Sequence, residues 1–226
     1  MSTPSLDNRR PLKSRSAGWA KAAAAALARL GVTPDIISAA SVGFAVLGAG
    51  FFLAAGLSDS GPRAGMLIGA GVCIQLRLLC NLLDGMVAVE HGRGSTAGPI
   101  WNELPDRLAD GLFLVGAGYC AWSAGFEAGA PLGWFAACLA VLTAYLRELG
   151  RSLGFPADFS GPMAKPHRMA ALTATCIVAA LEPLWGGKGQ VILVGLAVIA
   201  AGAAITAARR TRTLARRLAE RGSPQP

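Results

Sequence analysis

The stretch from Asn81 to Asp110, NLLDGMVAVEHGRGSTAGPIWNELPDRLAD, places acids and amides between two long apolar runs. About 20 mostly apolar residues are enough to span a lipid bilayer as a helix. An ionisable side chain at the centre of such a helix costs at least about 2.5–3.5 kcal/mol, so it persists where it faces a cavity or binds a ligand. We therefore interpret this stretch as the polar junction of two transmembrane helices and as the candidate functional site.

The composition of the chain is typical of a membrane protein. Only 15% of its residues are charged and 53% are hydrophobic, whereas about a quarter of the residues of a soluble domain are charged. The five cysteines lie in apolar stretches without the spacing of a metal or redox motif, so we interpret them as buried apolar side chains. The positive charge flanks apolar segments, so we attribute it to contact with anionic lipid and expect no binding of nucleic acid.

Six windows are long and apolar enough to span a membrane. They are residues 34–57, 64–89, 106–128, 131–151, 165–184 and 189–208. Short connections with turn residues join them, so the sequence predicts an all-α integral membrane protein, a bundle of six transmembrane helices. We expect three parts: a basic N-terminal segment (1–33), the six-helix domain (34–208) and a basic tail (209–226).

Basic residues cluster on one side of the predicted bundle. Six lie before the first span and six after the last, and the loops after the second and fourth spans add more. Only Arg63 and Lys188 fall on the opposite side. The positive-inside rule then places both termini and the polar junction on the cytoplasmic side of a bacterial-type inner membrane.

The segment Trp19–Leu30, WAKAAAAALARL, precedes the first span. Its alanines favour a helix, and its spaced basic residues predict an N-terminal interfacial helix that lies along the membrane surface. The alternative is a solvated helical lead-in to the first span.

Oxygen ligands are expected to converge at the polar junction. Asn81 and Asp84 are three residues apart and share one helix face. Asn102, Asp106 and Asp110 recur every four residues on the next helix. Carboxylate and amide oxygens suit a hard cation such as Mg²⁺ or Mn²⁺, and a divalent ion at the cytoplasmic face suggests phosphate chemistry.

Cations near the junction allow further interpretations. The acids could simply pair with Arg77 and Arg107 inside the bundle, which is the alternative to a metal site. A second basic cluster ends the fourth span and begins the fifth, and it contains Arg147, Arg151, Lys165 and Arg168. Arginine offers paired donors to phosphate and lysine offers a point charge, so we expect an anion pocket there. The alternative for this cluster is snorkelling toward lipid headgroups.

The junction resembles the signature of the CDP-alcohol phosphotransferase family, D-x2-D-G-x2-A-R-x8-G-x3-D-x3-D. Aligned on the DG pair, the signature covers 26 residues without an insertion and matches Asn81, Asp84, Gly85, Ala88, Val89, Gly98, Asn102 and Asp106. A six-span bundle with the signature at the second and third helices also fits. Two amides replace acids and Val89 replaces the arginine, and the stretch is similar to a bacterial subgroup of the family that carries the same amides.

The resemblance implies a role for each signature position. Four side chains would hold Mg²⁺ or Mn²⁺: Asn81, Asp84, Asn102 and Asp106. Asp106 would also be the general base that deprotonates the acceptor hydroxyl. Each amide still offers a carbonyl oxygen but removes a negative charge, which should weaken metal binding or change the number of ions held. Glu103 or Asp110 would be the groups that restore this charge.

The resemblance also implies where the substrates lie. The cytidine diphosphate group would lie beside Gly85, with Ala88 and Gly98 lining its pocket and Ser95 where family members often carry a hydroxyl residue. The second basic cluster would contribute to the acceptor pocket and bind a phosphate there. Family members tend to be homodimers, and we expect the same of this chain.

These observations predict an enzyme of phospholipid biosynthesis. It would transfer a phosphatidyl group from a CDP-alcohol, expected to be CDP-diacylglycerol, to the hydroxyl of an acceptor alcohol, with release of CMP. The reverse arrangement, a water-soluble CDP-alcohol and a lipid acceptor, fits the same residues. The alternatives from other classes are a catalytically silent membrane protein that binds a CDP-lipid and an ion-transport protein, because intramembrane acids often mark ion pathways.

Overall fold

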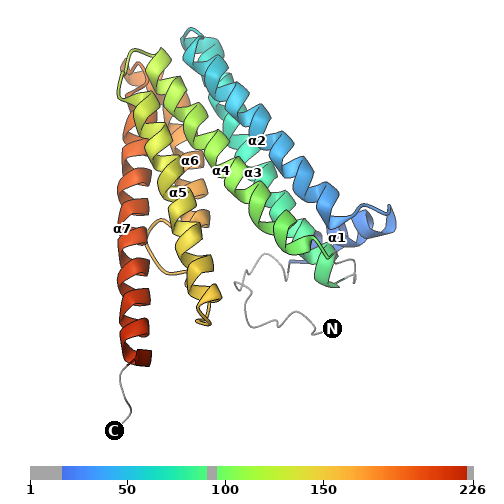
Figure 1. Ribbon diagram of the computed structural model, residues 1–226. Coiled ribbons are helices and arrows are strands. Elements are labelled where there is room, and N and C mark those ends of the chain that lie inside the picture. Colours follow the sequence, from blue (N-terminus) through green and yellow to red (C-terminus); the bar gives the residue numbers. More distant parts are fainter. Residues whose placement is uncertain (1–16, 91–95, 223–226) are drawn as a thin grey trace.

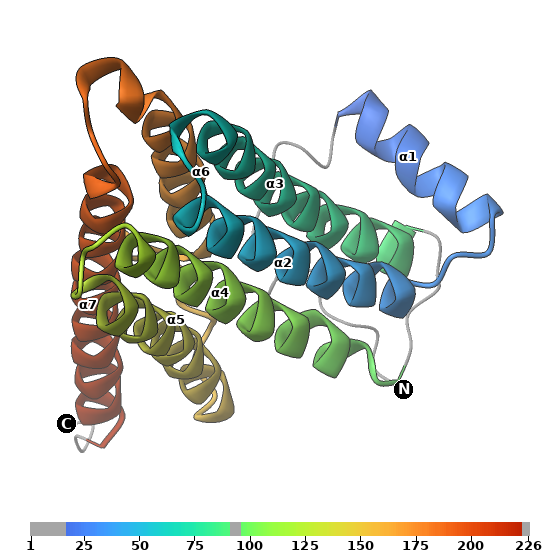
Figure 2. The same ribbon diagram turned by 90° about the horizontal axis from the view of Figure 1, so that it is seen from above.

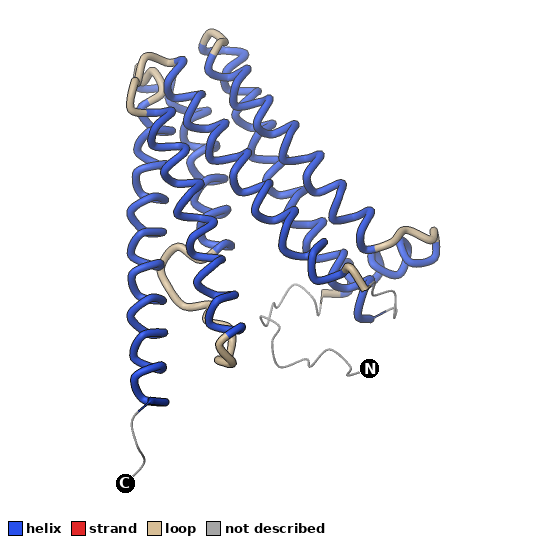
Figure 3. Tube along the Cα trace, in the orientation of Figure 1, coloured by secondary structure: helices blue, strands red, loops and turns tan. Residues whose placement is uncertain are grey.

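The computed structural model describes residues 17–90 and 96–222, and these two ranges contain helices and loops but no strand (Figure 3). In chain order the helices are α1 (Gly18–Arg29), α2 (Pro34–Gly56), α3 (Ser60–Glu90), α4 (Gly98–Ser123), α5 (Gly129–Ser152), α6 (Lys165–Leu181), the short 3-10 helix η3 (Glu182–Trp185) and α7 (Gln190–Gly222). Local signals set several of these boundaries. Thr33, for example, caps α2 by accepting a hydrogen bond from the backbone N–H of Ile36, and Pro34 suits the first helical position.

Five segments of the described chain are long and apolar enough to cross a membrane. They are Pro34–Gly56, Ser60–Val89, Gly129–Ser152, Lys165–Trp185 and Gln190–Gly222. The chain is therefore an all-α, multi-pass membrane protein, as the sequence predicts. The one predicted span that is missing from these five is the third, residues 106–128, which corresponds to α4; this helix is long but carries Asp106, Arg107 and Asp110 in its first half. The count of six spans therefore stays a prediction.

The packing order of the helices brings the polar junction together. Figure 2 shows α2 between α3 and α4, and α2 packs against both. α6 packs against α3, and α5 and α7 pack against α4. Successive long helices run in opposite directions, so the C-terminal half of α3 and the N-terminal half of α4 lie at the same end of the bundle (Figure 1).

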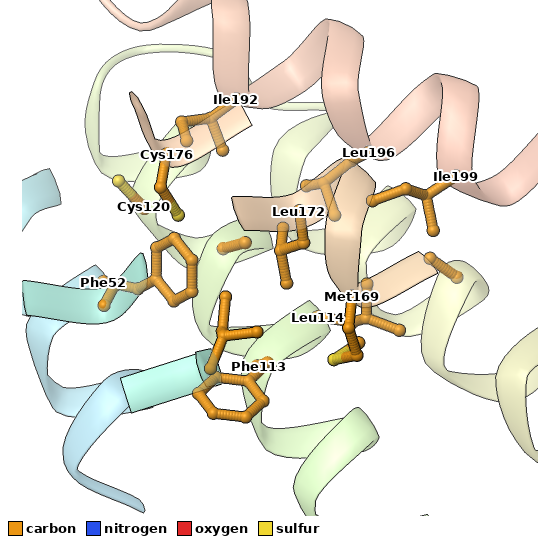
Figure 4. Close-up of a cluster of buried hydrophobic side chains, with 14 of the residues drawn as sticks. Phe52, Phe113, Leu114, Cys120, Met169, Leu172, Cys176, Ile192, Leu196 and Ile199 are labelled. Atoms are coloured by element: carbon orange, nitrogen blue, oxygen red, sulfur yellow. The ribbon is translucent and has the colours of Figure 1, made fainter. Parts of the chain in front are cut away.

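An apolar core fills the middle of the bundle. Large buried side chains come from α2, α3, α4, α6 and α7, and those of α2, α4, α6 and α7 include Phe52, Phe113, Leu114, Leu172, Leu196 and Ile199 (Figure 4). Alanines and buried cysteines occupy many of the remaining core positions. All five cysteines are free thiols; four of them are buried as expected, whereas Cys138 is exposed on α5, so the interpretation as a buried side chain is wrong there.

The tail predicted from residue 209 continues α7 as far as Gly222. Arg210 is 6% exposed and donates to the carbonyl oxygens of Thr143 at 2.6 Å and Ser160 at 3.1 Å. Arg221 donates to the carbonyl oxygen of Leu153 at 2.8 Å. The end of α7 therefore holds the loop between α5 and α6, the loop that leads into the N-terminus of α6.

α1 packs its alanine face against the bundle. Ala20, Ala24 and Ala28 are buried in a small cluster with residues of α2 and α3, whereas Trp19 is exposed. Figure 2 shows α1 lengthwise at the edge of the bundle, beside α3. A helix in this position could lie along a membrane surface, and that interfacial placement stays a prediction.

α4 and α5 approach each other through glycines. A Cβ added at Gly133 would lie 2.7 Å from the carbonyl oxygen of Leu114 and 2.8 Å from the Cα of Gly118. A Cβ at Gly129 would lie 2.7 Å from the carbonyl oxygen of Gly118. Gly129 and Gly133 form a GxxxG pattern, in which small residues let two membrane helices pack backbone to backbone.

Gly133→Ala should therefore destabilise the protein, although alanine is the better helix former. The added methyl would meet backbone atoms of α4, and overpacking of this kind costs about 1–3 kcal/mol. Thermal unfolding in detergent micelles should show a lower midpoint than for the wild type. The matched control is Gly50→Ala in α2, where no neighbouring atom lies within 4 Å of the added Cβ. Equal effects of the two substitutions would contradict the close approach of α4 and α5.

Candidate functional site

Seven polar side chains from three helices form one buried group, which we call the ionic cluster. They are Arg77, Asn81 and Asp84 of α3, Asp106 and Asp110 of α4, and Lys165 and Arg168 of α6. Their spacing explains why they meet. On α3 the three members follow one another at intervals of four and three residues, and on α4 the two acids are four residues apart. Each set therefore lies on one face of its helix.

Asp106 lies at the centre of the ionic cluster. Its Oδ1 accepts hydrogen bonds from Arg77 at 2.9 Å and from the side-chain amide of Asn81 at 2.5 Å. Its Oδ2 accepts from the Lys165 ammonium and lies 3.6 Å from the Arg107 guanidinium. The residue is only 6% exposed, so these partners together offset the cost of burying its charge.

Asp110, one turn further along α4, is buried in a second set of ion pairs. Its Oδ1 lies 3.2 Å from the Arg77 guanidinium, and its Oδ2 lies 2.6 Å from that of Arg168. Arg168 also donates to the carbonyl oxygen of Met163. Arg77 is fully buried and Asp110 and Arg168 are each 1% exposed, so Arg77 bridges the two acids of α4 in a space closed to solvent.

Asp84 differs from the other two acids because its partners are incomplete. Its Oδ2 accepts a hydrogen bond from the Ser38 hydroxyl of α2 at 2.6 Å. Its Oδ1 is buried and has no hydrogen-bond partner within residues 17–90 and 96–222. A buried acceptor without a partner is costly, so this oxygen is available for a ligand that supplies positive charge.

The donor set fits one divalent cation held mainly by oxygen. Asp84 has its unpartnered Oδ1, Asn81 lies one turn before it, and Asn81 touches Asp106. Across the two described ranges, no three acidic, histidine or cysteine side chains come close enough to hold a metal by themselves. Asn81 can add an amide carbonyl oxygen to the carboxylate oxygens of Asp84 and Asp106 at such a site.

Other predicted site residues lie around the ionic cluster or outside the described residues. Gly85 and Ala88 are half-buried on α3, and Gly98 begins α4. Ser95 lies outside the described residues. Asn102 belongs to α4, but its side chain is not among those described.

Glu103 does not join the acids of the ionic cluster. It pairs with Arg107 at 3.1 Å and with Arg147 of α5 at 2.5 Å. Glu148 in turn pairs with Arg147 and Arg151, each at 2.8 Å. The predicted anion pocket is therefore divided: Lys165 and Arg168 belong to the ionic cluster, while the two arginines of α5 pair with glutamates beside it.

Arg151 lies on the rim of an open depression of about 740 Å³. The depression is lined by the end of α5 and the loop that follows it, at Glu148, Arg151, Ser152, Gly154, Phe155 and Pro156. Arg151 is about half exposed, so the structure leaves it closer to solvent than Arg147, which also lies over the ring of Phe159.

Two members of the site were not among the functional candidates from sequence. From the sequence, Arg77 is considered only as a possible partner of the acids. It lies on an apolar helix, four residues before Asn81, and an arginine buried in this way requires acids on a neighbouring element. Ser38 gave no comparable signal, because a serine in a membrane helix commonly bonds its own backbone. Its contact with Asp84 depends on how α2 packs against α3.

Comparisons with known proteins agree with this geometry. The sequence is 28% identical over 201 residues to phosphatidylinositol phosphate synthase of Streptomyces avermitilis. This alignment covers 87% of this chain and 78% of that protein. The solved structure of the Mycobacterium tuberculosis enzyme of the same name, with CDP-DAG bound, superposes with a TM-score of 0.71 at 23% identity, covering 88% of this chain and 94% of that one. These relatives and the shared fold support the assignment of the chain to the CDP-alcohol phosphotransferase family.

The family assignment gives the ionic cluster its context. No model of a known protein family matches the sequence, so the assignment rests on the relatives, on the shared fold and on the signature residues. A second structure of the Mycobacterium tuberculosis enzyme contains manganese and citrate and superposes with a TM-score of 0.70 at 22% identity, over 86% of this chain and 88% of that one. Within the family signature, Asp84 and Asp106 are the two acids that this chain retains.

The pair formed by Asp110 and Arg168 should be strongly coupled. Removing one partner of a buried ion pair leaves an uncompensated charge and costs about 3–5 kcal/mol. Asp110→Asn and Arg168→Gln should each lower the thermal midpoint in detergent markedly, and the double variant should lose clearly less than the two losses combined.

The exposed pair Arg216–Glu220 on α7, with its nearest atoms 3.6 Å apart, is the control. Arg216→Gln should change stability by no more than about 1 kcal/mol, because exposed ion pairs contribute little. Additive losses for Asp110→Asn and Arg168→Gln would show that the two side chains do not form the buried pair.

Proposed function

We propose that the chain is an integral membrane CDP-alcohol phosphotransferase that transfers a phosphatidyl group from CDP-diacylglycerol to the hydroxyl of an acceptor alcohol and releases CMP. The observation that carries the proposal is the placement of the two retained signature acids inside a membrane bundle: Asp106 pairs with Lys165 and contacts Asn81, and Asp84 lies one turn after Asn81 with one oxygen unpartnered among the described residues. Phosphoryl transfer needs positioning and compensation of negative charge, and this arrangement provides both.

Oxygen ligands for Mg²⁺ or Mn²⁺ would come from Asp84, Asn81 and Asp106, with Asn102 as the fourth signature position. When bound, the divalent ion neutralises the phosphoryl oxygens of the donor. Ser38 fixes the Asp84 carboxylate by its hydrogen bond to Oδ2, so that Oδ1 keeps a constant direction. Gly85, next to Asp84, has no side chain and so leaves room for the diphosphate to approach the helix backbone.

Asp106 would accept the proton of the acceptor hydroxyl. The acceptor oxygen then forms a bond to the phosphorus that carries the diacylglycerol, the bond between that phosphorus and the bridging oxygen breaks, and CMP leaves with the electron pair. The proton moves to Oδ2 of Asp106, because Arg77 and Asn81 already hold Oδ1. Lys165 must therefore move from Oδ2 toward a substrate phosphate, which its flexible stem allows.

The acceptor is proposed to be an inositol phosphate. Relatives from three bacteria are phosphatidylinositol phosphate synthases, which supports this acceptor. Lys165, whose side chain is 21% exposed, and Arg147, at 15%, lie at the edge of the ionic cluster and could reach a phosphate on the acceptor. Arg168 is nearly closed to solvent, so its main role in the proposal is to fix Asp110.

The proposal includes the surroundings of the enzyme. Both termini and the ionic cluster would face the cytoplasm, in a cytoplasmic membrane of bacterial type, because basic residues flank that end of the bundle. A homodimer, as the family resemblance implies, is part of the same proposal.

The reaction can be tested by CMP release from CDP-diacylglycerol in mixed micelles, with inositol phosphate as acceptor and with Mg²⁺, Mn²⁺ or EDTA. The wild type should release CMP only with a divalent ion. Asp106→Asn should lower the rate by about 10²–10⁴-fold, the usual contribution of a general base. The control is Asp59→Asn, which removes an exposed acid from the loop between α2 and α3, at the opposite end of the bundle, and should leave the rate unchanged.

Two results would contradict the proposal in different ways. An Asp106→Asn variant as active as the wild type would exclude Asp106 as the base. A wild type that binds CDP-diacylglycerol but releases no CMP with any acceptor would favour the catalytically silent member, and the amides at positions 81 and 102 would then be the first residues to restore to acids.

The orientation predicts the labelling of new cysteines. Asp59→Cys should react with a membrane-impermeant maleimide on intact bacterial cells, whereas Arg212→Cys on α7 should react only after the membrane is permeabilised. Cys138 is the one natural cysteine that is exposed, so Cys138→Ala serves as the background for both. The opposite labelling pattern would reverse the orientation.

A further inference from the structure

Four members of the ionic cluster lie outside the family signature, and Arg77 is the one among them that belongs to α3. Its guanidinium is fully buried on α3 and donates to the Asp106 carboxylate, to the Asp106 backbone carbonyl and to the Asp110 carboxylate. Arginine remains charged in proteins, so a positive charge is permanently present between the two acids of α4.

The buried charges of the ionic cluster balance without a metal. The acids are Asp84, Asp106 and Asp110, and the cations are Arg77, Lys165 and Arg168, three of each sign. Beside the cluster, Glu103 pairs with Arg107 and Arg147, and Arg107 also lies 3.6 Å from Asp106. Two divalent ions would add four positive charges to this neutral group, whereas one ion adds two, which matches the two ionised phosphates of a CDP-alcohol.

Asn81 completes the compensation that Arg77 begins. Its amide nitrogen lies 2.5 Å from the same Asp106 oxygen that Arg77 holds. An aspartate at this position would place two carboxylates against each other, and like charges at that distance repel strongly. The amide is therefore the residue that suits an Asp106 already paired with an arginine, and Asp106 Oδ1 is closed to a metal.

We propose that Arg77 is a positioning residue that acts as a resident cation for Asp106 and Asp110, so that the site holds one divalent ion, anchored by Asp84, in place of two. The ion would use the open Oδ1 of Asp84 and the amide carbonyl oxygen of Asn81, so that Oδ2 of Asp106, once Lys165 moves away, stays free for the proton of the acceptor. This inference rests on the proposed function only for the identity of the ligand, a CDP-alcohol diphosphate, and not for the number of ions.

The number of bound ions can be counted with Mn²⁺ on the full-length protein in detergent, from the electron paramagnetic resonance signal of the free ion. The wild type should saturate at one Mn²⁺ per chain. The double variant Arg77→Gln/Asn81→Asp removes the resident cation and returns an acid, so it should saturate at two. Its thermal midpoint should also fall further on addition of EDTA than that of the wild type, because its acids then depend on the metal.

Arg63→Gln is the matched control, because Arg63 is the other buried arginine of α3 and bonds the Ala55 carbonyl oxygen at the opposite end of the helix. It should keep one Mn²⁺ per chain. A wild type that binds two ions, or none, would overturn the proposal even if the double variant fails to fold, and so would a folded double variant that still binds one.

The outcome is separable from that of the proposed function. One Mn²⁺ per chain without CMP release would contradict the enzyme and leave the role of Arg77 intact. CMP release with two ions per chain would do the reverse. Arg77→Lys, which keeps the charge but cannot bridge both acids in the same way, should retain one ion per chain and show a lower thermal midpoint.

Discussion

The ion pairs of Arg77 with Asp106 and Asp110 are the constraint on which the rest of the site depends. They join α3 to α4 across a space closed to solvent, and Arg168 and Lys165 extend the same network to α6. A charge inside a membrane bundle is tolerated only when it is paired. None of these helices can therefore shift along its neighbour without leaving a buried charge unpaired. The network therefore fixes the relative height of three helices, while Ser38 of α2 sets the direction of the Asp84 carboxylate.

The same network explains why the chain can depart from its family signature without losing the geometry. Two amides in place of acids remove negative charge, and a buried arginine supplies positive charge at the point where a metal would otherwise be needed. Two carboxylate oxygens are left for ligands: one oxygen of Asp84 lacks a partner in the described part of the chain, and one oxygen of Asp106 faces a lysine that can move. A site with these two openings suits a diphosphate and one divalent ion, and it leaves the electrostatic balance of the bundle intact.

Much of this arrangement follows from the sequence, because hydrophobic runs and their interruptions report directly on a lipid environment. The positions of α2, α3, α5 and α6 agree closely with the predicted spans. The acids at 106 and 110 lie on one face of α4, as their spacing predicts, and both pair with Arg77. The partners of those acids could not be assigned from the sequence, since they depend on which helices are neighbours. Glu103 was predicted as a source of compensating charge, but it pairs with Arg107 and Arg147. The helix α7 continues beyond the predicted span, because the hydrophobic pattern ends where its last turns become polar while those turns still pack against a loop.

The most direct test of the central claim follows the phosphorus itself. CDP-diacylglycerol labelled on the phosphate that carries the diacylglycerol should transfer its label to a lipid that also contains the inositol phosphate, and unlabelled CMP should appear in equal amount. This result would establish that the acceptor attacks the lipid-linked phosphorus inside the ionic cluster. Label recovered only in the donor, under conditions where the protein is folded and loaded with Mn²⁺, would contradict the account.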